Sequence, residues 1–401
     1  MQLQSNTAQS QLVKKTAWLL CAVAINALEF IVPRLPFFPW LKPGLANVIT
    51  ILWIVEFGGV DALAYSLLRI WIVGFYFGFS FLTMSLALSG GVLATCAMAL
   101  AWRLTGKNRL LGTVGLGIIG ALFHNVGQLC AVYYLMSANI HLFYQVPVML
   151  AASILFGGIV GGLAPLADRM FRAAPELVTP ERLQLGRFSA TPHDRFFSAL
   201  LLAACTAIVF TNSIAALAGA AAGATLIAQV ILKGSWSALA KPLSRFWVLF
   251  AFVACVNVFF SYGARIEGLP FLTREGIDLT IGQWLRLWTW LQVSAILFYF
   301  RFDAVMFDAL STLFRKHHET LFAGVLALEY FPGIAEDSKM YVRKKLSLFF
   351  FQRKNRADRQ GKTGLQGIDR WAEGLYSLVV RRMEEKKEGT AEKMLEGEVS
   401  P

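Results

Sequence analysis

Long apolar segments separated by short polar ones run through most of this chain. Within residues 15–168 there are six such segments, at roughly 17–32, 45–57, 62–77, 81–102, 110–135 and 143–167. Four more follow at roughly 196–210, 214–232, 247–262 and 281–300. A helix of about 20 apolar residues crosses the core of a bilayer, whereas a membrane β-barrel would need alternating segments of about ten residues, which the chain lacks. The pattern predicts an all-α integral membrane protein, because helices satisfy their own backbone hydrogen bonds in lipid.

Composition supports this class. Hydrophobic residues make up 56% of the chain and charged residues only 15%, against about 25% charged residues in soluble domains. In a soluble protein the net charge of +12 would indicate nucleic-acid binding. Here the basic residues gather in polar loops and near the C terminus, which favours a positive cytoplasmic face and contact with anionic membrane lipid, with no nucleic-acid partner. The five cysteines lie in apolar segments without CxxC spacing, so we predict no metal and no other cofactor.

Basic residues also set the expected topology. Lys14 and Lys15 precede the first segment, and five arginines lie in the polar stretch between the sixth and seventh segments. With both groups in the cytoplasm, the two termini are cytoplasmic and the chain lies in the inner (cytoplasmic) membrane. The predicted parts are a disordered N terminus, a first membrane domain, a cytoplasmic linker, a second group of spans, cytoplasmic helices that begin with an amphipathic one, and a charged tail: 1–14, 15–168, 169–195, 196–300, 301–385 and 386–401.

Arg69 stands in the middle of the third apolar segment. Placing an arginine at the centre of a membrane helix costs about 2.5–3.5 kcal/mol on insertion scales. A residue with this cost is expected to pair with a carboxylate or to face a cavity, and Glu29 and Glu56 are the candidate partners.

Other polar residues fall within apolar segments of the same domain. Asn47 lies near the start of the second segment, and His124, Asn125 and Gln128 lie together in the fifth. His124 and Gln128 are four residues apart, so a helix presents them on one face. With Arg69 they predict a buried site for a small polar molecule. The alternative is that they form hydrogen bonds that hold neighbouring helices together.

Small residues recur at helical spacing. The sixth segment contains two overlapping GxxxG pairs, Gly157 with Gly161 and Gly158 with Gly162, and Gly219 with Gly223 forms another pair later in the chain. Such faces let membrane helices approach closely.

Three blocks of the first domain resemble a known family: KPGLANVITILWIVEFGGVDALAYSLLRIW, FLTMSLALSGG and GALFHNVGQL. They are similar to heptaprenyl diphosphate synthase component I, also called the Gx transporter family, over nearly all of residues 15–168. That family is similar to the substrate-binding S components of energy-coupling factor (ECF) transporters, which implies a six-helix bundle that binds a small nutrient or cofactor precursor. The enzyme name fits less well, because prenyl transfer needs carboxylates that hold Mg²⁺ and the chain has no DDxxD-like cluster.

The second half resembles the transmembrane T component of ECF transporters, the cobalt-transport permease family. The matching features are His193-Asp194-Arg195, the four apolar segments and the stretch ALEYFPGIAEDSKMYVRKK. The resemblance implies a four- to five-span module with cytoplasmic coupling helices, in which Arg343 and Arg381 dock onto ATP-binding subunits. Both positions depart from the family's alanine–arginine–small pattern, and the alternative is that they are positive-inside residues on a solvated helix.

Together the two resemblances predict an S component fused to a T component in one ECF-type importer chain. The chain has no P-loop, because Arg356 stands where Gly361-Lys362-Thr363 would require a preceding glycine. ATP hydrolysis is therefore expected on separate chains, and no GxSxG, HExxH or paired-carboxylate motif predicts an enzyme. Two alternatives stay open: an accessory membrane subunit of a heptaprenyl diphosphate synthase, and a stand-alone secondary carrier.

Overall fold

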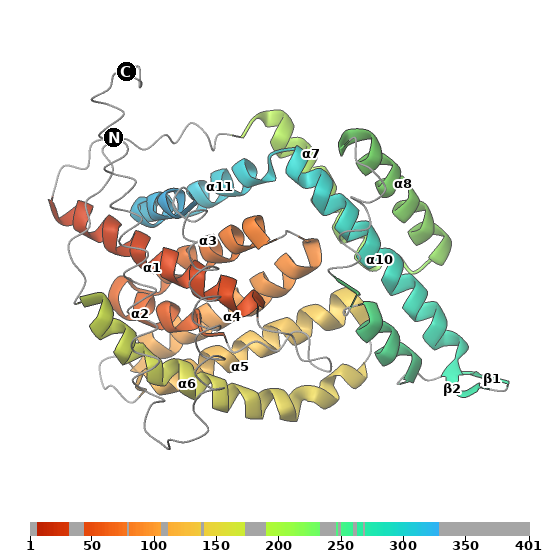
Figure 1. The fold of residues 1–401 in the computed structure, drawn as a ribbon, viewed down its shortest axis with the longest axis horizontal. Helices are drawn as coiled ribbons and strands as arrows, with labels where there is room; N and C mark the ends of the chain where they lie inside the picture. The colour runs from red at the N-terminus through yellow and green to blue at the C-terminus, as the bar shows by residue number, and fades with distance from the viewer. Residues whose placement is uncertain are drawn as a thin grey trace, which may run out of the picture.

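A computed structural model confirms the predicted all-α class. It describes residues 6–31, 44–77, 80–105, 111–137, 140–172, 190–232, 246–247, 250–259, 263–267 and 269–328. Two groups of helices lie side by side, the first formed by α1 to α6 and the second by α7, α8 and α10, and α11 runs along the first group (Figure 1).

The helices of the first half follow the predicted apolar segments. They are α1 (Asn6–Ile31), α2 (Asn47–Phe57), α3 (Gly59–Phe77), α4 (Phe81–Thr105), α5 (Thr113–Val132) and α6 (Val146–Arg172). Between α5 and α6 lie a short π-helix, Tyr133–Ser137, and a 3-10 helix, Ile140–Gln145.

The first helix begins earlier than predicted. Residues 6–14 were expected to belong to a disordered N terminus, yet α1 starts at Asn6. Packing explains the difference, because Leu12 and Val13 are buried in the helical bundle. The two lysines that follow are also held by carboxylates, Lys14 by Glu56 and Lys15 by Asp61.

The short helix α2 has a glycine with positive φ on each side. Gly44, three residues before α2, has φ +70°, and Gly58, which separates α2 from α3, has φ +88°. Glycine adopts this region without the steric cost that a Cβ brings. These two turns confine α2 to 11 residues and let α3 run back beside it.

One face of α6 packs closely on α5 through glycine. A Cβ on Gly157 would lie 2.6 Å from the carbonyl oxygen of Gly117, and a Cβ on Gly161 would collide with the Thr113 carbonyl. Gly158 and Gly162 have open space beside them instead. Of the two overlapping GxxxG pairs, the Gly157–Gly161 pair therefore forms the contact with α5.

The second half contains helices and one small hairpin. The elements are α7 (Pro192–Phe210), α8 (Ile214–Leu232), the helix Phe250–Phe259, β1 (Arg265–Ile266), β2 (Leu269–Thr273), α10 (Arg274–Tyr299), α11 (Phe302–Leu313) and the 3-10 turn Arg315–His317. A further helix covers 318–328. The antiparallel β1–β2 hairpin, which pairs Arg265 with Thr273, was not predicted.

Among the described residues, six helices are long and apolar enough to cross a membrane. They are Gly59–Tyr76, Phe81–Thr105, Thr113–Leu135, Phe143–Phe171, Pro192–Phe210 and Ile214–Leu232. Asn47–Phe57 and Phe250–Phe259 are apolar but shorter. The chain is thus compatible with a multi-pass membrane protein, and the full count of ten spans stays a prediction.

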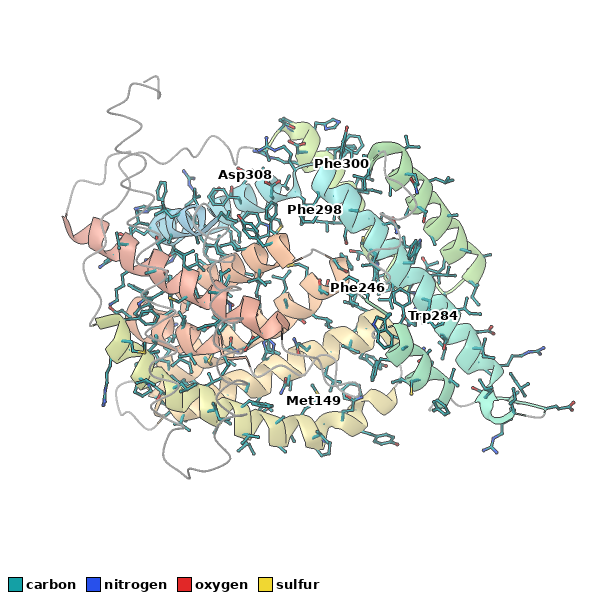
Figure 2. All side chains as sticks on the ribbon, in the orientation of Figure 1. Met149, Phe246, Trp284, Phe298, Phe300 and Asp308 are labelled. Atoms are coloured by element: carbon teal, nitrogen blue, oxygen red, sulfur yellow. The ribbon has the colours of Figure 1, made fainter. Side chains whose placement is uncertain are left out.

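The hydrophobic core crosses the predicted boundaries between domains. Phe307, Leu310, Phe314 and the helix 318–328 share one buried cluster with α1 to α4. A second cluster joins α4, α5 and α6 to the second half, and Trp290 of α10 contacts Phe81 at a ring distance of 5.4 Å. Figure 2 shows Phe298 near the end of α10 that leads into α11, where its ring lies 5.6 Å from that of Phe75. The amphipathic helix predicted at the start of 301–385 is α11, and its buried residues Phe307 and Leu310 pack on the first half.

Candidate functional site

The guanidinium of Arg69 lies buried between α3 and α2. The residue is 4% exposed. Nη2 donates to Asn47 Oδ1 at 3.2 Å and Nη1 donates to Thr50 Oγ1 at 3.4 Å. The face of Tyr65 lies 5.7 Å from the guanidinium carbon. The structure thus brings two predicted site residues, Asn47 and Arg69, into direct contact.

The carboxylate partners predicted for Arg69 are wrong. Glu56 is held by Lys14, and the Glu29 carboxylate accepts a hydrogen bond from the backbone amide of Leu45. Within the described part of the chain, Arg69 forms no ion pair and its hydrogen bonds go to neutral oxygens. The rotation of α2 explains this, because it turns Asn47 and Thr50, rather than Glu56, toward Arg69.

Three of the predicted residues line one small cavity between α2, α5 and α6. Asn47 lines it from α2, His124 and Asn125 line it from α5, and Phe156 lines it from α6. The space holds about one water-sized molecule. Arg69 joins this group through its hydrogen bond to Asn47.

The alternative reading of these polar residues holds for Asn125. Its Nδ2 donates to Ser153 Oγ at 2.8 Å and to the Met149 carbonyl at 3.4 Å, so it links α5 to α6. Gln128 is buried one turn further along α5 and faces Gly90 of α4. Its Oε1 has no hydrogen-bond partner among the described residues.

A second polar cluster, which the sequence did not reveal, surrounds the carboxylate of Asp61. Lys15 Nζ lies 3.0 Å from Oδ2, and Trp53 Nε1 donates to Oδ1 at 2.8 Å. From the second half, His317 Nδ1 lies 3.0 Å from Oδ2, and the Thr320 hydroxyl donates to Oδ1. We call these five residues the Asp61 network. It joins α1, α2 and α3 to the segment that follows α11.

Four of the five residues of the Asp61 network are buried, and His317 is partly exposed. The network contains the opposite charges of Lys15 and Asp61. The side chains of Lys15 and Asp61 are 4% and 7% exposed, and Glu319 Oε2 lies 3.2 Å from the same Lys15 nitrogen. The Lys15 ammonium also lies 4.8 Å from the centre of the Phe57 ring. The sequence pointed to this cluster only through Asp61, a carboxylate at the start of an apolar segment. The partners of Asp61 could not be inferred, because they lie up to 259 residues away in the sequence.

The motif His193-Asp194-Arg195 has structural contacts at the start of α7. Asp194 and Thr191 form a capping box, in which the Asp194 amide donates to Thr191 Oγ1 at 3.1 Å. Arg195 Nη2 lies 2.9 Å from Asp308 Oδ2 of α11, and the ring of His193 lies 5.7 Å from that of Phe300. These contacts fix α7 against the α10–α11 junction.

The two residues predicted to couple to ATPases, Arg343 and Arg381, lie outside the described residues. So do residues 329–385 of the predicted cytoplasmic helices and the whole of the predicted tail, 386–401. Over the part of the chain that the structure does describe, no group of three or more His, Cys, Asp or Glu side chains could hold a metal ion.

The all-α fold and the six long apolar helices among the described residues are those of a helical protein compatible with several membrane crossings. Residues 19–166 match the family model described as heptaprenyl diphosphate synthase component I. The match runs from α1 to α6, contains all five predicted binding residues and agrees with the resemblance predicted for residues 15–168. No curated protein and no solved structure matches the chain.

Proposed function

We propose that this chain is a membrane subunit of an ECF-type importer that combines substrate binding with coupling to separate ATP-binding subunits. Residues 15–168 bind a small nutrient or cofactor precursor, and the residues from 190 onward hold that module and couple it to the ATPases. The observation that carries the proposal is the Asp61 network, because it fastens the two halves together through buried polar contacts.

The substrate-binding role is supported by the convergence of polar side chains within an apolar bundle. Asn47, Arg69, His124 and Asn125 come from three helices and meet at or beside one cavity. Polar groups inside membrane bundles are costly and commonly mark a ligand or ion site. Gln128, one turn from His124 on the same face of α5, extends the candidate surface toward α4.

The coupling role is supported by the path of the chain after α10. The segment 302–328 packs on the first half and leads to the stretch that contains Arg343. A movement of coupling helices driven by ATP binding would therefore reach α3 through His317 and Thr320. Arginine suits docking of this kind because its planar fork makes several hydrogen bonds at once.

Affinity purification of the intact chain tests the proposal. ABC-type ATPases should copurify with it, and Arg343→Glu should abolish their recovery, whereas Lys386→Glu in the tail should not. Persistent recovery with Arg343→Glu would contradict the docking assignment.

The alternative function is an accessory membrane subunit of a prenyl diphosphate synthase, which the family description favours. Recovery of a soluble prenyltransferase subunit in place of ATPases would establish it. Recovery of neither, together with ATP-independent uptake in vesicles, would indicate a stand-alone carrier.

A further inference from the structure

Arg69 is a buried cation with no counter-charge among the residues that the structure describes. Its two hydrogen bonds are long, 3.2 and 3.4 Å, and both go to neutral side-chain oxygens. Its Nε is buried and has no hydrogen-bond partner among the described residues. A guanidinium carries five N–H donors, so this one is only partly satisfied.

The nearest helices use their carboxylates elsewhere. Asp61 is on the same helix as Arg69 but about 12 Å along it, and its oxygens bind Lys15 and the rest of the Asp61 network. Glu56 pairs with Lys14, and Glu29 accepts from the Leu45 amide. Because each of these carboxylates has partners of its own, none of them forms an ion pair with Arg69 within the described residues.

We propose that Arg69 binds the carboxylate or phosphate group of a small anionic ligand. Both groups accept two parallel hydrogen bonds from a guanidinium fork. Asn47 and Thr50, already in contact with Arg69, would contact the same group. Because Asn47 also lines the cavity between α2, α5 and α6, the rest of the ligand would extend toward α5 and α6.

This inference deepens the proposed function by naming the chemical class of its substrate. It rests on the proposed function only in treating the ligand as the transported substrate, because anion binding to Arg69 requires no partner subunit. We expect the ligand to enter by a movement of α2, the helix that carries Asn47 and Thr50. The cavity holds about one water-sized molecule, so α2 must move, and Gly44 and Gly58 with positive φ lie at the two ends of this short helix.

Thermal unfolding of the full chain in detergent tests the proposal. Sodium acetate and sodium phosphate are the probes, acetamide is the neutral isostere of acetate, and ionic strength is held constant with sodium chloride. Wild-type protein should show a saturable rise in Tm with acetate or phosphate and none with acetamide. The response to acetate or to phosphate distinguishes the two anionic groups.

Three variants make the result specific to Arg69. Arg69→Gln should abolish the rise in Tm, and Arg69→Lys, which keeps the charge without the fork, should raise the half-saturating concentration about tenfold. The matched control is Arg286→Gln, which removes a half-buried arginine of α10 bonded to Thr211 and Asn212 and should leave the response unchanged. If Arg69→Gln does not fold, Arg69→Lys alone decides.

The proposal is overturned if neither anion gives a saturable rise in Tm in the wild-type protein. It is also overturned if Arg69→Gln and Arg69→Lys show the same rise as the wild-type protein. Failure of the importer proposal has a different signature. If no ATPase copurifies but the anion response depends on Arg69, anion binding stands without import. If ATPases copurify and no anion binds, import stands with a substrate that is not anionic.

Discussion

Lys14 and Lys15 are adjacent in the sequence and have different environments. The side chains of Lys14 and Glu56 are 30% and 32% exposed, and an exposed pair contributes about 0–1 kcal/mol. Lys15 and Asp61 are almost fully buried, and each has further partners of its own. In a buried network the loss of one charge leaves the opposite charge poorly compensated, and this costs more stability than breaking an exposed pair.

Asp61→Asn should therefore destabilise the protein by about 3 kcal/mol, at the low end for a broken buried pair because Glu319 still contacts Lys15. Glu56→Gln, which breaks the exposed pair, should cost less than about 1 kcal/mol. Unfolding of the full chain in detergent measures both. Equal effects of the two substitutions would show that burial does not distinguish the pairs.

The same argument predicts a rescue. In the double variant Lys15→Met/Asp61→Asn, the buried ammonium is removed together with its counter-charge. We expect it to be more stable than Asp61→Asn alone by about 1 kcal/mol, because the Lys15 ammonium, which keeps only the part-buried Glu319 as a charged partner in Asp61→Asn, no longer has to be desolvated. A double-mutant cycle from the same unfolding measurements gives the coupling energy, and strictly additive effects would contradict a direct interaction.

At the scale of the element, the position of each glycine on its helix decides its role. Gly161 lies against the backbone of α5, whereas the neighbouring Gly162 is exposed with nothing beside it. The GxxxG pattern alone could not separate them, because both pairs have the same spacing. The direction in which α6 faces α5 is set by the packing of the bundle.

Gly161→Leu should destabilise the bundle by about 1–3 kcal/mol or more, since a side chain there must push α5 and α6 apart. Gly162→Leu, of the same size and one position away, should have little effect. Thermal stability and the fraction of monodisperse protein in detergent measure the difference. A stable Gly161→Leu protein would show that α5 and α6 do not approach closely.

At the scale of the whole molecule, α10 places the β1–β2 hairpin far from the Asp61 network. Its 26 residues extend about 39 Å, more than the roughly 30 Å core of a bilayer. The hairpin lies at one end of α10 and α11 follows the other end (Figure 1). The linker is predicted to be cytoplasmic, and three predicted spans, 196–210, 214–232 and 247–262, separate it from the hairpin, so the predicted topology puts the hairpin outside.

A topology reporter tests this arrangement. A reporter active only in the cytoplasm should work when inserted in the linker at Arg182 and fail when inserted in the hairpin turn at Glu267. A reporter active only outside the cytoplasm should show the reverse. Activity of one reporter at both sites would contradict the predicted number of membrane crossings between them.

The sequence predicted the positions of the helices well and their partners poorly. The segment at 214–232 coincides with α8, and α2, α4 and α7 begin or end within a few residues of the predicted limits. The partners of Arg69 were wrong, although its burial was foreseen. Glu56 has the right charge to pair with Arg69, but it pairs with Lys14 instead. This pairing depends on how α1 lies against α2, which the sequence does not show.

By itself, the sequence determined the class of the protein and the elements that compose it, because apolar length and the lack of charge are local properties that decide whether a helix can enter a bilayer. It also marked Asn47, Arg69 and His124 as polar residues in apolar surroundings. Only the tertiary structure decided that 302–328 packs on the first half and that Asp61 joins residues as distant as Lys15 and Thr320. Such contacts depend on how each helix is rotated and where it lies against its neighbours, and a segment that is apolar on most of its faces does not fix either in its sequence.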